Sequence, residues 1–195
     1  MTHVAGRSPE SRRAARMAPL AVLPVFLKLA GRRVVVAGGN EAAVWKAELL
    51  AAAGAHVDVI ADDACHEMLE LAATSSGGRV SLQNRAWRPD DLPGAAFAIG
   101  AIEQDEKARA FRDAARVAGV PVNVIDKPDF CDVQFGGIVN RSPLVIGIST
   151  DGAAPVFGQA IRARIEALLP AGLATWAETA RAWRRRVNAM NLPFR

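Results

Sequence analysis

The feature that most constrains this chain is the stretch from Arg33 to Leu50, where an apolar run passes through paired glycines into a helix-forming segment. Such a strand-to-helix transition is how nucleotide-binding α/β domains present a helix N-terminus to a phosphate. The free N–H groups and partial positive charge of a helix start stabilise an anion there. The loop reads Gly38-Gly39-Asn40-Glu41-Ala42-Ala43, so Asn40 replaces the middle glycine of G-x-G-x-x-G/A. The stretch predicts a nucleotide site from a motif that matches only in part.

Apolar runs and helix-forming segments alternate over residues 33–125. Strands are expected at 33–37, 56–60, 80–84, 95–102 and 121–125, and helices at 41–53, 64–74 and 104–118. This order predicts an α/β fold with a Rossmann-like, doubly wound parallel sheet. Ligands bind such sheets beyond the C-terminal ends of the strands. Gly38, Asp62, Ile102 and Asp126 are therefore expected on one ligand-binding edge.

The pattern changes after residue 126. Residues 135–140 and 144–149 are strand-like and predict a hairpin, whose exposed edge favours pairing with a second subunit. Two helices are expected to follow, at 154–168 and 172–190, with Trp176 and Trp183 facing inward. The predicted organisation is a disordered extension (1–19), a Rossmann domain that binds NAD (20–125), a hairpin dimerisation region (126–152) and a small helical C-terminal domain (153–195).

Composition narrows the function classes. The chain is 51% hydrophobic and 23% charged, which is typical of a globular protein. The net charge of +4 comes without aromatic–basic repeats, so no nucleic-acid partner is expected. No apolar run approaches the ~20 residues that span a bilayer, so no membrane association is expected. Two cysteines and three scattered histidines suggest neither a disulfide framework nor a metal site, and a cytoplasmic protein is predicted.

Beyond the glycine loop, the chain carries an ordered series of motifs. They are Leu23-Pro24-Val25-Phe26, Gly38-Gly39-x-Glu41-x-Ala43 with Lys46, Asn123-Val124-Ile125-Asp126, Cys131-Asp132, Ile138-Val139-x-Arg141-x-Pro143-Leu144, Ile148-Ser149-Thr150-x-Gly152-x-x-Pro155, Ile161-Arg162, Ile165-Glu166 and Leu168-Leu169-Pro170. In this order and spacing they resemble the precorrin-2 dehydrogenase/sirohydrochlorin ferrochelatase module of siroheme synthases. The resemblance extends over about residues 20–187.

The resemblance implies a homodimer whose tetrapyrrole substrate lies between the cofactor and the partner subunit. In this family NAD oxidises precorrin-2 to sirohydrochlorin, and many members then insert ferrous iron as a second substrate. The essential aspartate of the family falls on Asp126. The cofactor contacts carried over from the family, together with neighbouring positions of the loop and of the nicotinamide end, are Gly38, Gly39, Asn40, Glu41, Ala42, Asp62, Asp63 and Ile102. Candidate substrate residues are Asn123, Arg141, Thr150 and Arg162, and no resident metal is expected.

Several alternatives stay open from the sequence. Asp62 and Asp63 are as well suited to capping the next helix as to binding a ribose, and Cys131 suits a packing role better than a reactive thiolate. A second function hypothesis is a chelatase or tetrapyrrole-binding protein whose dehydrogenase activity is weakened by Asn40 and Ile102. A third is a Rossmann module that senses a dinucleotide without turning over a tetrapyrrole.

Overall fold

The computed structural model describes residues 18–170 and 172–190. Seventeen of the nineteen residues predicted to form a disordered extension lie outside the described part of the chain. The strands are β1 (Arg33–Gly39), β2 (His56–Ala64), β3 (Val80–Asn84), β4 (Phe97–Gly100), β5 (Val122–Val124), β6 (Gly137–Arg141) and β7 (Leu144–Ile148). The helices are α1 (Glu41–Ala52), α2 (His66–Thr74), α3 (Asp105–Val117), α4 (Pro155–Leu168) and α5 (Leu173–Ala189). Short 3₁₀ turns η1 (Ser76–Gly78), η2 (Pro89–Asp91) and η3 (Pro128–Phe130) connect them.

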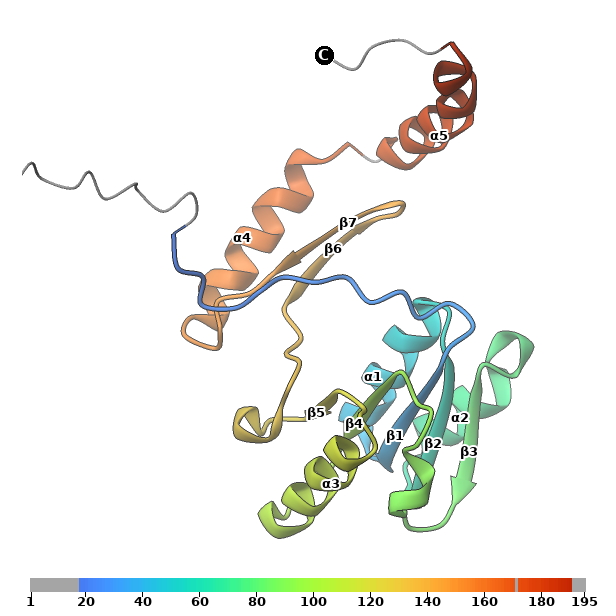
Figure 1. Ribbon diagram of the computed structural model, residues 1–195, viewed down its shortest axis with the longest axis vertical. Coiled ribbons are helices and arrows are strands. Elements are labelled where there is room, and N and C mark those ends of the chain that lie inside the picture. The colour runs from blue at the N-terminus through green and yellow to red at the C-terminus, as the bar shows by residue number, and fades with distance from the viewer. Residues whose placement is uncertain (1–17, 171, 191–195) are drawn as a thin grey trace, which may run out of the picture.

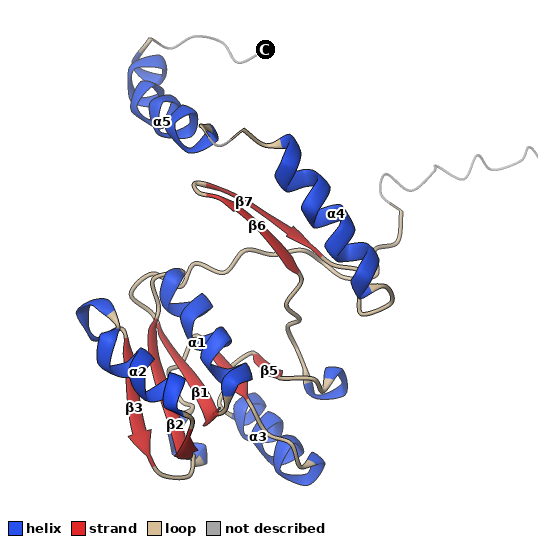
Figure 2. Cartoon of the chain, turned by 180° about the vertical axis from the view of Figure 1, so that it is seen from behind, coloured by secondary structure: helices blue, strands red, loops and turns tan. Residues whose placement is uncertain are grey.

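The first five strands form one parallel sheet in the order β3-β2-β1-β4-β5. Its central strand, β1, is fully buried from Val34 to Ala37, as a strand covered on both faces must be. In β1, even-numbered positions such as Val34 pack against α1 and α2, and odd-numbered positions such as Val35 pack against α3. Figures 1 and 2 show α1 and α2 on one face of the sheet and α3 on the other. The predicted doubly wound fold is confirmed.

The C-terminal third forms a separate layer. Strands β6 and β7 pair antiparallel as a hairpin, and α4 packs against β6. Figure 1 shows the hairpin and α4 joined to the sheet domain by the segment that follows η3, with α5 beyond the hairpin. A hairpin followed by a helical tail was the predicted arrangement, and it is confirmed.

Two local predictions are wrong. Strand β2 does not end at residue 60 but continues to Ala64, because the bulge that follows Ala37 lets Gly39 pair with Ala64. In α5, Trp176 and Trp183 do not face inward: their residues are 78% and 55% exposed. Helix α5 makes its main contacts with β7 alone, so this chain offers it no core to cover.

Candidate functional site

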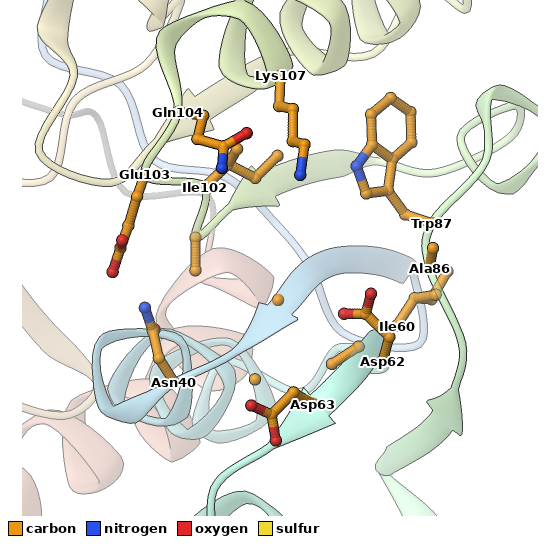
Figure 3. A pocket seen from close by; sticks show the side chains of 14 residues that line it. Asn40, Ile60, Asp62, Asp63, Ala86, Trp87, Ile102, Glu103, Gln104 and Lys107 are labelled. Atoms are coloured by element: carbon orange, nitrogen blue, oxygen red, sulfur yellow. The ribbon is translucent and has the colours of Figure 1, made fainter.

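A cavity of about 520 Å³ opens where β1, β2 and β4 end. It is lined by the glycine loop, the end of β2, the loop after β3 and the start of α3, as Figure 3 shows. The lining residues are Gly38, Gly39, Asn40, Ile60, Ala61, Asp62, Asp63, Ala86, Trp87, Ala101, Ile102, Glu103, Gln104 and Lys107. Six of the eight expected cofactor residues are among them. Glu41 and Ala42 form the first turn of α1 and do not line the cavity.

The paired glycines let the end of β1 approach the backbone of β2 and of the segment after β4 at the floor of the cavity. Gly38 has φ +106, and a Cβ there would lie 2.7 Å from the carbonyl oxygen of Ala101 after β4. A Cβ on Gly39 would lie 2.8 Å from the Cα of Ala64 in β2. Any side chain at either position would push β1 away from a neighbouring strand, so both glycines are required by close approach.

Asn40 is the N-cap of α1. Its backbone is extended, with φ −78 and ψ 172, and its Oδ1 accepts a hydrogen bond of 3.0 Å from the N–H of Ala43. The position therefore does not need a left-handed residue. The asparagine instead satisfies one of the free donors that a helix start offers to a phosphate.

Asp62 and Asp63 both belong to the extension of β2 and are exposed at the cavity. Neither aspartate caps α2, whose N-cap is Cys65, so the capping alternative is wrong. Figure 3 shows both carboxylates on the rim, where hydroxyl groups of a ribose can donate to them.

The opposite wall carries residues that the sequence reasoning missed. Trp87 follows β3 and packs edge-on against Phe111 of α3, with ring centroids 5.0 Å apart. Lys107 projects from the first turns of α3 and supplies the cationic side chain of the lining. Because Trp87 follows a strand of the same sheet, its place at this edge could have been inferred from the strand order.

Asp126 lies at the same edge of the sheet but does not line the cavity. The sheet ladder continues past β5 through the N–H of Ile125, which donates to Gly100 O at 2.9 Å. The chain then turns, with the Lys127 N–H donating to Val124 O at 3.2 Å and Asp126 at φ +59. A residue with positive φ at this place in a turn is rare unless it is Gly, Asn or Asp. The carboxylate is exposed.

The thiol of Cys131 forms hydrogen bonds with the backbone on both sides of Asp126. Its Sγ lies 3.2 Å from both Val124 O and Lys127 O, and it accepts from the Val124 N–H and from Asn123 Nδ2 at 3.3 Å. Burial raises the pKa of the thiol, which keeps its proton available for donation. The packing role weighed for Cys131 fits these contacts.

Lys46 of α1 reaches the same region from the side. The residue is only 8% exposed, and its Nζ lies 3.7 Å from the centroid of the Phe135 ring. Burial lowers the pKa of its amine to about 8, while the nearby Asp126 and Cys131 act in the opposite direction. Among residues 18–170 and 172–190 no ion pair or hydrogen bond to its Nζ is found.

The remaining substrate candidates are distributed over three places. Asn123 is buried on β5, where its Oδ1 has no partner among the described residues. Arg141 on β6 and Arg162 on α4 both bind the carboxylate of Glu166, at 3.1 and 2.6 Å. Thr150 Oγ1 accepts from the Ala154 N–H at 3.4 Å, just before α4. These residues do not share the cavity of the glycine loop.

Two family models match this chain. Residues 25–137 match the family described as "Putative NAD(P)-binding", which covers more than half of the chain. Residues 141–168 match a family described as "Sirohaem biosynthesis protein central". The first match includes the whole cavity and Asp126, and the second covers most of the hairpin and α4.

Several curated proteins are similar over most of this chain. The siroheme synthase of Stutzerimonas stutzeri is 40% identical over 167 residues, which are 86% of this chain and 35% of that protein. The siroheme synthase of Azotobacter vinelandii is 42% identical over 169 residues, 86% of this chain and 36% of that protein. The chain thus spans about a third of the length of these relatives.

A solved structure has the same fold. The structure of SirC, precorrin-2 dehydrogenase, superimposes with a TM-score of 0.66 at 21% identity, covering 88% of this chain and 83% of that chain. No helix within the described ranges combines the length and apolarity that crossing a bilayer takes.

Proposed function

Since the chain belongs to the NAD(P)-binding family that siroheme synthases share, we propose that it oxidises precorrin-2 to sirohydrochlorin with NAD as the hydride acceptor. The observation that carries this proposal is the proximity of two features along one sheet edge: a dinucleotide-sized cavity after β1, β2 and β4, and Asp126 after the adjacent strand β5. The similarity to siroheme synthases and to a precorrin-2 dehydrogenase supports the choice of substrate.

The lining residues fit a dinucleotide. The backbone at Gly38 and Gly39 leaves no room for a Cβ and brings the start of α1 to the cavity, where N–H groups stabilise a diphosphate. Lys107 adds positive charge on the far wall. Asp62 and Asp63 suit the hydroxyls of a ribose and would repel a 2′-phosphate, which favours NAD over NADP.

Asp126 is proposed to handle protons. NAD, when bound, supplies the acceptor for the hydride that leaves the macrocycle. A proton must leave a neighbouring position, and a carboxylate held in a fixed turn and open to the ligand side can accept it. Arg141 and Arg162 are the candidates to meet substrate carboxylates, because guanidinium groups bind carboxylates in a bidentate way.

The test is anaerobic turnover of precorrin-2 with NAD, followed by the absorbance of sirohydrochlorin. Asp126→Asn keeps a residue that tolerates positive φ but removes the base, so we expect kcat to fall by about 100-fold or more. Asp129→Asn, an exposed carboxylate three residues later, is the matched control and should retain full activity. Full activity in Asp126→Asn would remove the proposed role of Asp126, and no turnover in the parent protein would overturn the function.

We propose iron insertion as a second step at the same carboxylate. Ferrous iron entering sirohydrochlorin displaces pyrrole protons, which Asp126 can accept as it does in the oxidation. Incubation of sirohydrochlorin and ferrous iron with and without the protein measures this step. A rate no faster than the uncatalysed one would reject it and leave a dehydrogenase.

We also propose that the working form is a homodimer in the cytoplasm. Large apolar side chains of α4 and of the segment before β1 are exposed in the single chain, which supports a second subunit that covers them. Cys65 and Cys131 are free thiols, and Cys131 is engaged as a hydrogen-bonding thiol, which suits a reducing compartment.

A further inference from the structure

The backbone at Asp126 adopts a conformation that few residues adopt. With φ +59 the residue lies in the left-handed region, and Asp151 is the only other described residue besides glycine with a positive φ. Such a conformation persists only where the surrounding structure enforces it, and it is found most often at functional sites. The contacts that hold the turn around Asp126 therefore bear on how its carboxylate is presented.

Asp126 is the third residue of a four-residue turn that follows β5. The N–H of Lys127 closes this turn on Val124 O at 3.2 Å. Both ends of the turn also contact a single sulfur atom. Cys131 Sγ lies 3.2 Å from both Val124 O and Lys127 O, and it accepts from the Val124 N–H at 3.3 Å. Because a thiol can donate and accept, the side chain of Cys131 bridges the first and the last residue of the turn.

A buried asparagine holds the sulfur in place. Asn123 on β5 is only 7% exposed, and its Nδ2 donates to Cys131 Sγ at 3.3 Å and to Val133 O at 2.9 Å. The backbone N–H of Cys131 in addition donates to Pro128 O at 3.0 Å. The thiol is thus attached to β5 and to η3 independently of its contacts with the turn.

We propose that Cys131 is a positioning residue for Asp126: its thiol bridges the two ends of the turn and so maintains the left-handed backbone on which the carboxylate is presented for proton transfer. This inference rests on the proposed dehydrogenase function. A cysteine that only fills space would also be partly buried here, but its capacity for hydrogen bonds would then have no effect on turnover. The two roles differ in what a hydroxyl group at this position would restore.

Two substitutions at Cys131 separate these roles. Alanine and serine are similar in size and differ in the hydroxyl group, which can donate and accept as the thiol does. The kcat for precorrin-2 should fall about tenfold in Cys131→Ala and stay within about threefold of the parent in Cys131→Ser. The dissociation constant of NAD should be unchanged in both, because neither Cys131 nor the turn lines the cavity of the glycine loop.

The chain supplies a matched control. Cys65→Ala makes the same change at the only other cysteine, and it should keep the parental kcat. A parental kcat in Cys131→Ala, or a loss in Cys131→Ser as large as that in Cys131→Ala, would overturn the proposal while the dehydrogenase function stands.

Amide hydrogen exchange tests the turn without turnover. The Lys127 N–H donates to Val124 O and not to the sulfur, so its exchange rate reports whether the turn opens. In Cys131→Ala it should exchange about tenfold faster than in the parent, and in Cys131→Ser at close to the parental rate. The amide of Val36 in the buried centre of β1 reports global unfolding and is the reference. An acceleration at Lys127 that is absent, or no larger than at Val36, would overturn the proposal, even for a protein that does not oxidise precorrin-2.

Discussion

At the scale of single residues, Asn40 is the position whose interpretation the structure revises most. As a departure from the glycine motif it raised the question of whether phosphate can approach. In the structure Asn40 caps α1, since its Oδ1 accepts a hydrogen bond of 3.0 Å from the Ala43 N–H. That N–H is one of the donors that a bound diphosphate would otherwise use. The Asn40 side chain would therefore compete with a bound diphosphate for this donor.

We predict that Asn40→Gly binds NAD several-fold more tightly. Glycine frees the Ala43 N–H and removes a side chain from the cavity, at a cost in helix capping of only a few tenths of a kcal/mol. Asn40→Asp is the matched variant, because aspartate caps equally well but repels the diphosphate. Its NAD dissociation constant should rise about tenfold. Calorimetric titration with NAD measures both.

The absence of any effect on NAD binding would also be informative. An unchanged dissociation constant in both variants would mean that this loop does not bind the diphosphate of NAD through the start of α1. It would favour the alternative in which the dehydrogenase activity is weakened and the chain serves as a chelatase or a tetrapyrrole-binding protein.

Single residues also show where sequence reasoning stops. Gly38, Asn40, Asp62, Asp63 and Ile102 were named from the motif and the strand ends, and the structure brings them to one cavity. Other lining residues, on the far wall, were not named, because no local motif marks them and only the fold brings that wall to the cavity. Lys46 was seen only as part of a motif. Its contact with the Phe135 ring joins residues 89 positions apart, which periodicity cannot reveal.

At the scale of elements, one glycine at the end of β1 and one after α3 both have a positive φ but differ in the space around them. Gly38 combines a positive φ with a Cβ position 2.7 Å from the Ala101 carbonyl oxygen, which belongs to a backbone that cannot move easily. Gly119, just after α3, also has a positive φ, of +68, but open space around its Cβ position. A side chain at Gly119 would meet backbone strain alone, whereas one at Gly38 would meet both backbone strain and a steric clash.

We predict that Gly119→Ala costs about 1 kcal/mol of unfolding free energy, the strain of a left-handed alanine. Gly38→Ala should cost about 3 kcal/mol or more, because it adds the clash with the Ala101 carbonyl to the same strain. Urea denaturation of the two variants and the parent measures the difference. Equal costs would show that β1 and β4 separate readily and that the close approach is not a constraint.

Element boundaries were predictable where the local pattern decides them and wrong where a neighbour does. Strands β1 and β3 begin where the apolar runs begin, and α1 begins after its asparagine cap. Strand β2 runs four residues longer than its apolar run, since β1 extends the pairing through a bulge. The inward face of α5 was misassigned because the helical pattern shows which residues are apolar but not what they will contact.

At the scale of the whole molecule, the apolar surface is unevenly distributed. Val156 and Phe157 at the start of α4 are 82% and 62% exposed, and Leu23 and Phe26 before β1 are 74% and 71% exposed. In the sheet domain, the large apolar side chains that are exposed, such as Trp45, Leu69 and Val117, stand on three different helices. A two-stranded hairpin has little stability of its own, and here the described residues give it only α4 as a well-packed neighbour. The C-terminal layer therefore has more to gain from a second copy than the sheet domain has.

We predict that sedimentation or light scattering gives twice the monomer mass at micromolar concentration, and that Phe157→Glu gives a monomer. A charge at that position would have to be buried without a partner on association. Val117→Glu is the control, because Val117 is 91% exposed at the end of α3 on the sheet domain, and this variant should remain dimeric. A monomeric parent protein, or a dimer that survives Phe157→Glu, would contradict the proposed interface.

The cavity of the glycine loop and the cluster around Asp126 have no residue in common. For a protein engineer this separation is useful. Asp62 and Asp63 are exposed residues at the end of β2, and among the described residues no hydrogen bond or ion pair joins them to the turn after β5. If they bind the ribose as proposed, exchanging them should change the preference between the two pyridine nucleotides. On the proposed function, such an exchange would leave the turn that carries Asp126 unchanged, so coenzyme preference and proton transfer could be evolved one after the other.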